Sequence, residues 1–189
     1  HRRQWEGVAP DLAPLGWVTR NGYDPKYVPN VFGGHDGQIE NSRGLLTKHP
    51  NRIIHVSRPE RGLGPLLAMW PALRAKVPDA ELRLCRYQSM YDGEGSEVRN
   101  TCLQYDEIVK LWNEKIGGIT WLGSLGKADL YREIAEAAVM WYPGIAEFAE
   151  TSCIAAIESQ ACGTPLVLSA KGALPETAPH ALFIEGNAR

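Results

Sequence analysis

The sequence predicts an α/β fold in which helices cover both faces of a mostly parallel sheet. Two observations predict it. From residue 52 onward, strand-like and helix-like segments alternate along the chain, and the strand-like segments are apolar on both faces. The chain has 189 residues, of which 44% are hydrophobic and 22% charged, so it can bury the core of one globular domain.

Short apolar runs mark the strands. RIIHVS is a continuous apolar segment, and the runs that follow it have the same character. The predicted strands cover residues 52–57, 81–86, 119–122, 139–143, 165–169 and 181–185. WVTRNG, residues 17–22, fits one more strand that ends in an Asn-Gly turn, and we expect a long loop over residues 23–44.

Helix-like patterns fill the spaces between these strands. The clearest pattern places apolar residues three or four positions apart, and Gly117-Gly118 ends it. Its members are Val98, Cys102, Tyr105, Val109, Trp112 and Ile116. The other predicted helices cover residues 63–73, 125–138, 150–161 and 174–178.

Composition and charge exclude several classes of function. A net charge of −2 creates no broad cationic field, so we expect no nucleic-acid partner. No apolar run is long enough to cross a bilayer, and no signal peptide opens the chain. The four cysteines lack metal-type spacing and resemble core residues of a reducing compartment. We therefore expect a cytoplasmic protein, with any peripheral attachment to a membrane made through parts outside this chain.

The loop SRPERGLGP, residues 57–65, is the first that could carry chemistry, because ligands of such sheets bind beyond the carboxyl ends of strands. Arg58 and Arg61 lie at the entry to a helix, where guanidinium and backbone N–H groups suit a diphosphate. Arginines that are simply solvated explain this loop equally well. Leu67 stands where G-x-G-x-x-G needs its third glycine, which argues against an NAD site.

The segment ETSCIAAIE is the second such loop. Thr151 and Ser152 are natural N-cap residues, so we expect Glu150 at the lip of a helix. Glu158 lies two turns inside it, about 10–12 Å further along the axis. Two such carboxylates would hold the two ends of one elongated ligand, a sugar at one end and ribose at the other. Dipole stabilisation is the competing explanation for Glu150, whereas Glu158 has apolar neighbours and needs a partner if buried.

The third loop is GALPE, residues 172–176. Small residues let a ligand approach the backbone, and Glu176 could bond sugar hydroxyls. Taken alone, a carboxylate that stabilises the helix dipole is the favoured explanation for Glu176.

Together these motifs resemble the nucleotide-sugar-binding, C-terminal half of a GT-B glycosyltransferase of the retaining family 4, the glycosyl transferases group 1. The family's E-x7-E motif is matched by Glu150 and Glu158, and its glycine-rich loop by GALPE. SRPERGL, WLGSL and VTRNGYDP match three further segments in the right order. The resemblance runs from Trp17 to the end of the chain and implies a doubly wound, Rossmann-like parallel sheet that is one half of a GT-B fold.

The resemblance also implies a role for each matched residue. Glu158 would bind the ribose hydroxyls and Glu150 would face the donor sugar, while Arg58 and Arg61 would hold the diphosphate. The other donor-binding residues that it implies are Thr151, Ser152 and Cys153 at the helix start, Gly172, Ala173 and Glu176 on the sugar side, and Leu122 and Leu125 near the base. Two departures stand out: the family usually has Lys at the position of Arg61, and Ala173 replaces a glycine.

The implied domain organisation is a linker-proximal segment over residues 1–50 and a donor-binding domain over residues 51–189. The chain opens on His1, and we expect it to be a fragment of a larger enzyme. Most of the acceptor site would lie in an N-terminal half outside this chain, so the fragment alone would be inactive.

The implied activity is transfer of a sugar from a nucleoside diphosphate sugar to an acceptor glycan or other hydroxyl compound, with retention, in polysaccharide or glycoconjugate biosynthesis. The sequence has no Asp-x-Asp motif, and His35, His49 and His55 share no metal-type spacing. Arginines and the helix start, rather than a metal or another cofactor, would then balance the leaving diphosphate. Two alternatives stay open: a noncatalytic nucleotide-binding module, and an NAD-type Rossmann oxidoreductase domain.

Overall fold

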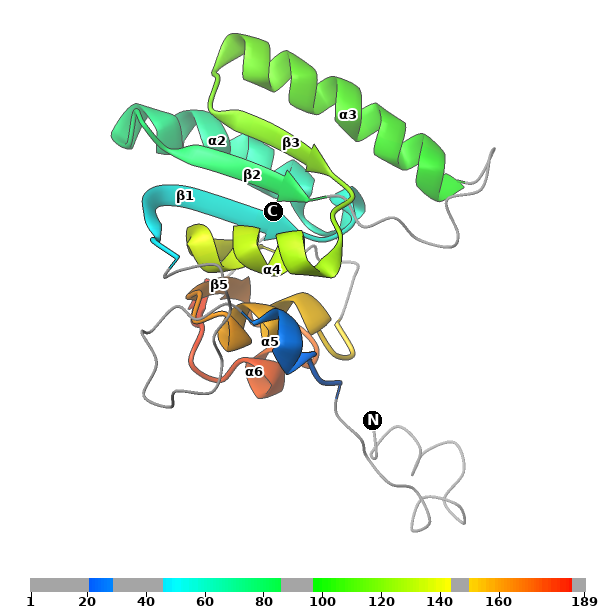
Figure 1. Ribbon diagram of the computed structural model, residues 1–189. Coiled ribbons are helices and arrows are strands. Elements are labelled where there is room, and N and C mark those ends of the chain that lie inside the picture. Colours follow the sequence, from blue (N-terminus) through cyan, green and yellow to red (C-terminus); the bar gives the residue numbers. More distant parts are fainter. Residues whose placement is uncertain (1–20, 29–45, 86–96, 144–149, 185–189) are drawn as a thin grey trace.

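A computed structural model of the chain describes residues 21–28, 46–85, 97–143 and 150–184. Its centre is a six-stranded parallel sheet in the order β3-β2-β1-β4-β5-β6 (Figure 1). The strands are β1 (His49–Val56), β2 (Glu81–Cys85), β3 (Ile119–Gly123), β4 (Ala137–Tyr142), β5 (Leu166–Ser169) and β6 (Leu182–Ile184). The predicted α/β class with a doubly wound parallel sheet is confirmed.

Helices connect these strands, as the alternating pattern predicts. They are α2 (Leu63–Lys76), α3 (Glu97–Lys115), α4 (Lys127–Glu136), α5 (Ile154–Ala161) and α6 (Leu174–Thr177). Two short 3-10 helices, η2 (Pro25–Tyr27) and η3 (Pro59–Arg61), complete the described elements. Most boundaries agree with the predicted segments, but α5 begins at Ile154 instead of near residue 150.

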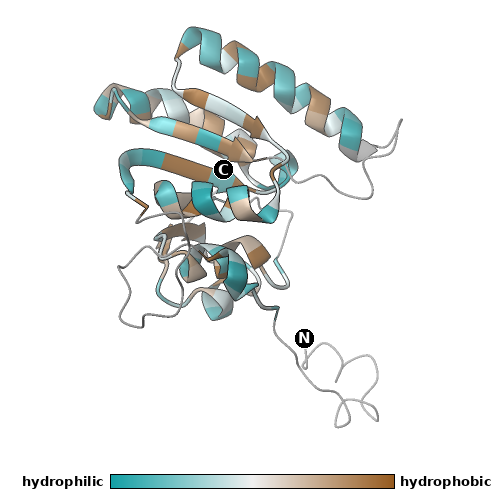
Figure 2. Ribbon diagram, viewed as in Figure 1, coloured by the Kyte–Doolittle hydropathy of each residue, from teal (hydrophilic) through white to brown (hydrophobic). Residues whose placement is uncertain are grey.

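The apolar residues form one cluster on each face of the sheet. On one face, Ile53 and Leu82 pack with Trp70 of α2 and Val109 of α3. On the other face, strand residues pack with α4, α5 and α6; the largest of its fully buried members are Tyr131, Tyr142, Ile54, Ile134, Met140 and Leu168. Figure 2 shows hydrophilic and hydrophobic residues interspersed along α3, where Leu103, Ile108 and Leu111 are exposed. Coverage of both faces explains why the strands have no polar side.

The four cysteines, Cys85, Cys102, Cys153 and Cys162, are free and buried, in agreement with their prediction as core residues. Of the predicted linker-proximal segment, only residues 21–28 and 46–50 are described, so most of the predicted strand over 17–22, most of the loop over 23–44, and His35 lie outside the described residues. Within the described ranges, no helix combines the length and apolar character required to cross a membrane.

Candidate functional site

The strand order reverses between β1 and β4, and this reversal positions the candidate site. The two strands pair in parallel, with Ile54 opposite Met140, so their carboxyl ends lie at the same edge of the sheet. The chain then leaves β1 toward α2 on one face and β4 toward α5 on the other. Doubly wound sheets bind their ligands where the order reverses in this way. Arg61 follows β1, and Glu150 follows β4.

The two arginines predicted to hold the diphosphate, Arg58 and Arg61, have different partners in the structure. Arg58 forms an ion pair with Glu60 of the same loop, with 2.8 Å between Nε and Oε1. Arg61 lies instead across from Glu150, 3.4 Å from Nη1 to Oε1. The turn closes at Gly62, whose φ of 121° suits glycine, and α2 begins at the next residue. The structure therefore joins Arg61, but not Arg58, to the carboxylate that follows β4.

Glu150 is buried and held by donors from two strand ends. Its carboxylate is only 8% exposed, and the hydroxyl of Tyr142 donates a hydrogen bond of 2.6 Å to the same oxygen that Arg61 approaches. Burial raises the pKa of Tyr142, with further increases from its hydrogen bond to Glu150 and from that charge. Tyr142 is therefore a neutral donor that fixes the direction of the Glu150 carboxylate.

The predicted N-caps of the following helix are wrong. Helix α5 has Cys153 as its N-cap, in an extended conformation and without a side-chain cap hydrogen bond, so Thr151 and Ser152 precede the helix. The reason lies in the backbone of Glu150, whose carbonyl accepts a 2.7 Å hydrogen bond from the N–H of Ala173. Because the Glu150 carbonyl is used in this contact, residues 150–152 are not helical. The first free helical N–H groups therefore follow Cys153.

Cys153 itself lies at this helix start. Burial raises the pKa of its thiol to about 11, with smaller and opposing effects from the backbone N–H of Ala156 and the carboxylate of Glu150. The thiol is therefore neutral at physiological pH, and it is a poor nucleophile because reactivity requires the thiolate.

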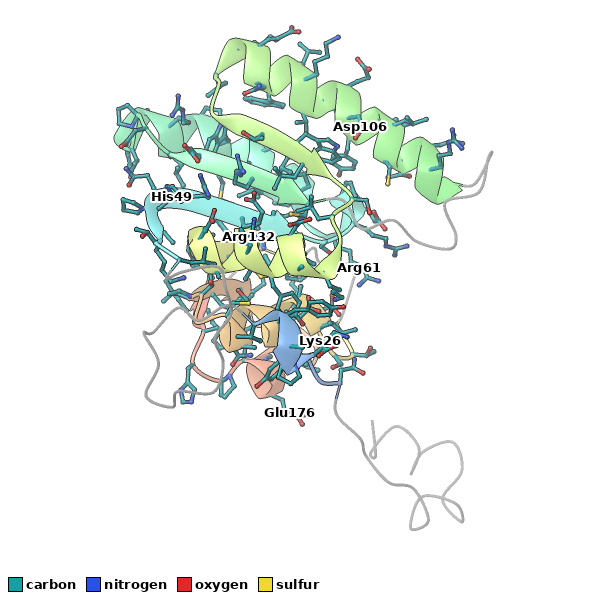
Figure 3. All side chains as sticks on the ribbon, viewed as in Figure 1. Lys26, His49, Arg61, Asp106, Arg132 and Glu176 are labelled. Carbon is teal, nitrogen blue, oxygen red and sulfur yellow. The ribbon has the colours of Figure 1, made fainter. Side chains whose placement is uncertain are left out.

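The backbone of the GALPE loop contacts the backbone of Glu150. Gly172 has a φ of 55°, and a Cβ added to it would lie 2.2 Å from the Glu150 carbonyl oxygen. Only glycine permits this approach, which explains why the loop begins with one. Glu176 is exposed on α6 and projects away from the sheet (Figure 3). The structure thus joins the first two residues of this loop to Glu150, whereas Glu176 lies at the surface.

Glu158 is buried inside α5, and it has the partner that its burial requires. The residue is 4% exposed. Lys127, the first residue of α4, forms an ion pair with its Oε1, and the hydroxyl of Tyr131 donates a 3.1 Å hydrogen bond to the same oxygen. Sequence reasoning predicted a partner but did not identify Lys127 or Tyr131. Their i, i+4 spacing on one helix face was the available signal.

Leu122 is near the end of β3, and Leu125 lies between β3 and the start of α4. Both are partly buried and pack against the cluster that contains Tyr131. The segment that they occupy leads directly to Lys127, so these two leucines and Glu158 belong to the same side of the sheet. Within the part of the chain that the structure describes, no group of three or more His, Cys, Asp or Glu side chains could hold a metal ion.

His55 of β1 is buried against Tyr142, the residue that holds Glu150. It is 1% exposed, its ring stacks on that of Tyr142 at 6.0 Å, and Nδ1 lies 3.0 Å from the carbonyl oxygen of Trp141. Burial lowers the pKa of His55 to about 4, so the ring is neutral and we assign its proton to Nδ1. His55, which shares no metal-type spacing with the other histidines, therefore lies in the core.

Replacing Tyr142 with phenylalanine is expected to lower the free energy of unfolding by about 1–3 kcal/mol, because Glu150 would lose a buried hydrogen bond. Urea unfolding measures this loss. Tyr105→Phe is the control, since the Tyr105 hydroxyl makes no hydrogen bond among the described residues, and its cost should stay within about 0.5 kcal/mol. Equal losses in the two variants would contradict the role of Tyr142.

A family model described as glycosyl transferases group 1 matches residues 50–188 of the chain. Among solved structures, an OtsA apo structure superposes with a TM-score of 0.61 at 17% identity, covering 87% of this chain and 39% of that one. An α,α-trehalose-phosphate synthase (UDP-forming) from Burkholderia vietnamiensis gives 0.59 at 15% identity, covering 74% and 34%. AviGT4, a glycosyltransferase involved in avilamycin A biosynthesis, gives 0.58 at 17% identity, covering 89% and 43%.

These likenesses establish the fold, and they extend over only part of each solved structure. The chain spans about two fifths of the length of the OtsA and AviGT4 structures. No curated protein sequence matches it.

Proposed function

The chain belongs to the glycosyl transferases group 1, and from this we propose that it is the donor-binding half of an enzyme that transfers a sugar from a nucleoside diphosphate sugar to an acceptor hydroxyl with retention. One observation carries the proposal. Two buried carboxylates, Glu150 and Glu158, flank the start of α5 at the reversal of the sheet, with Arg61 beside the first. A ligand with hydroxyl groups at both ends and negative charge between them fits this pattern.

Glu158 would accept hydrogen bonds from the two ribose hydroxyls. Leu122 and Leu125, which pack near the start of α4, would contact the base. At the other end of the ligand, Glu150 would face the donor sugar, where Gly172 and Ala173 already contact its backbone. The exposed Glu176 and the surface around Thr151 would extend the sugar side.

The diphosphate would lie between these ends. Arg61 and the N–H groups around Ser152, Cys153 and the first turn of α5 supply positive charge there, with Arg58 further out along its loop. Since the diphosphate is the leaving group, these donors would stabilise the charge that develops on it. We propose that this arrangement needs no metal ion, because the arginine and the backbone donors can meet the charge directly.

The acceptor site would lie mainly in the other half of the enzyme. We expect this chain alone to bind the donor nucleotide but to transfer sugar very slowly or not at all. We also propose that the enzyme acts in polysaccharide or glycoconjugate biosynthesis in the cytoplasm, where buried thiols such as those of this chain stay reduced.

Calorimetric titration of the chain with UDP, GDP, ADP and NAD tests the proposal. One nucleoside diphosphate should bind in preference to the others and to NAD. Replacing Glu158 with alanine should weaken that binding about ten- to a hundredfold, because a hydrogen bond to a charged group contributes about 1.5–3 kcal/mol. Addition of EDTA or Mn²⁺ should leave the affinity unchanged.

Glu133→Ala is the matched control. Glu133 of α4 is partly buried, and it pairs with Arg83 of β2, which is not one of the residues assigned to the ligand. The Glu133→Ala variant should bind the nucleotide with an affinity within about twofold of wild type. Binding of NAD alone would overturn the proposed function, and so would equal losses in the Glu133 and Glu158 variants. Binding that requires Mn²⁺ would overturn the metal-free arrangement.

A further inference from the structure

The carboxylate of Glu158 is anchored through one oxygen only. Both hydrogen bonds that it accepts from described residues, from Lys127 and from Tyr131, end on Oε1. Among those residues no hydrogen bond reaches Oε2, and Oε2 is not one of the buried oxygens without a partner. A carboxylate fixed by one oxygen has the other available for a ligand. The two anchors therefore set the direction in which Glu158 presents its second oxygen.

The two anchors differ in character. Tyr131 is 1% exposed, and its burial raises its pKa, so it is a fixed neutral donor. Lys127 is about half-exposed and is the cation that pairs with Glu158; its ammonium also lies 5.7 Å from the centre of the Tyr131 ring. Cys162 also interacts electrostatically with Glu158, and its thiol is neutral because burial raises its pKa to about 12. Lys127 is thus the only positive charge that contacts this carboxylate among the described residues.

We propose that Lys127 is a positioning residue for nucleotide binding, which holds Glu158 ionised and oriented so that it can accept both ribose hydroxyls. The proposal rests on the proposed function of Glu158. Burial of an unpaired carboxylate is costly, and such a group binds a proton instead. A protonated Glu158 would lose acceptor capacity where the ribose diol needs it. Without Lys127, nucleotide binding should therefore gain a pH dependence beyond that of the nucleotide itself.

The test compares Lys127→Met with Lys127→Arg in nucleotide titrations from about pH 5.5 to about pH 8.5. UDP, GDP and ADP serve as the probes. The terminal phosphate of each probe titrates at about pH 6, so every variant is compared with wild type at the same pH. Lys127→Arg should follow wild type across the range. Lys127→Met should bind about tenfold more weakly at the acidic end and recover toward the alkaline end, as the carboxylate loses its proton. Lys127→Gln, also uncharged, should behave like the methionine variant.

Glu158→Gln, whose side-chain amide cannot titrate, provides the matched control. Adding Glu158→Gln to Lys127→Met should remove the pH dependence that the lysine substitution introduces. A loss of affinity in Lys127→Met that is equal at every pH would assign Lys127 a merely structural role and overturn the proposal. Unchanged affinity at every pH would overturn it as well.

A second measurement separates this proposal from the proposed function. Infrared difference spectra of wild type and Lys127→Met, with Glu158→Gln to assign the band, report directly whether Glu158 carries a proton. A protonated carboxyl band should appear in Lys127→Met at mildly acidic pH, and its absence would overturn the proposal even if nucleotides bind. If the band appears but no nucleotide binds to wild type, the failure lies with the proposed function.

Discussion

Replacing Gly172 with alanine is expected to destabilise the chain by about 2–5 kcal/mol and to abolish the contact between the GALPE loop and Glu150. The new Cβ would lie 2.2 Å from the carbonyl oxygen of Glu150 and 2.7 Å from its backbone nitrogen. Both atoms belong to the backbone, which cannot rotate away as a side chain can. The φ of 55° adds the strain of a left-handed conformation.

Gly123→Ala measures the cost of the left-handed backbone conformation without the steric collision of a new Cβ. Gly123 has a similar φ, 67°, but a Cβ there would meet nothing within 4 Å. Its replacement should cost only about 1–2 kcal/mol in urea unfolding. Gly172→Ala should cost clearly more, and it should also weaken nucleotide binding, because the hydrogen bond from Ala173 holds the segment that carries Glu150. Similar costs in the two variants would contradict the close approach.

The strand and helix pattern was predictable because each element carries its own signal. Six apolar runs gave the six strands, and the three- to four-residue spacing around Cys102 and Val109 gave α3. The strand order could not be predicted in this way. The pairing of β1 with β4 joins segments more than 80 residues apart, and no local pattern encodes it.

In the candidate site, too, local patterns identified the residues but not their long-range contacts. Glu150 and Glu158 were recognisable from their spacing, and burial implied a partner for Glu158. That the partner is Lys127 depends on how α4 packs beside α5, which spacing alone does not determine. The N-cap prediction was wrong at Thr151 and Ser152 for a related reason. A long-range hydrogen bond to the Glu150 carbonyl outweighed the local preference of their hydroxyls for a helix start.

These contacts divide the site into a fixed part and an adjustable part. Tyr131 and Tyr142 are buried phenols that each hold one carboxylate in place. Lys127 and Arg61 are more exposed cations paired with the same carboxylates. Under the proposed function, a ligand between Glu150 and Glu158 would draw on Arg61 for its diphosphate, whereas Lys127 would remain paired with Glu158.

The stability of the chain is expected to fall by about 3 kcal/mol between pH 6.5 and pH 4 through His55 alone. In the unfolded chain His55 binds a proton below pH 6.5, whereas in the folded chain burial lowers its pKa to about 4. Between these values the unfolded state binds more protons, so acid favours unfolding. Protonation in the fold is unfavourable because Nε2 is buried without a hydrogen-bond partner among the described residues.

Urea unfolding at several pH values measures this effect against two variants. His55→Gln should lose the corresponding slope of about 1.4 kcal/mol per pH unit below pH 6.5, whereas His49→Gln, at the exposed start of the same strand, should retain it. A wild-type slope that survives in His55→Gln would assign the acid sensitivity to other groups. Because His55 stacks on Tyr142, acid that protonates it should also loosen the phenol that holds Glu150. In the folded chain His55 takes up a proton only near its lowered pKa of about 4, so any weakening of nucleotide binding through this residue should appear there and not at about pH 5.5 or above.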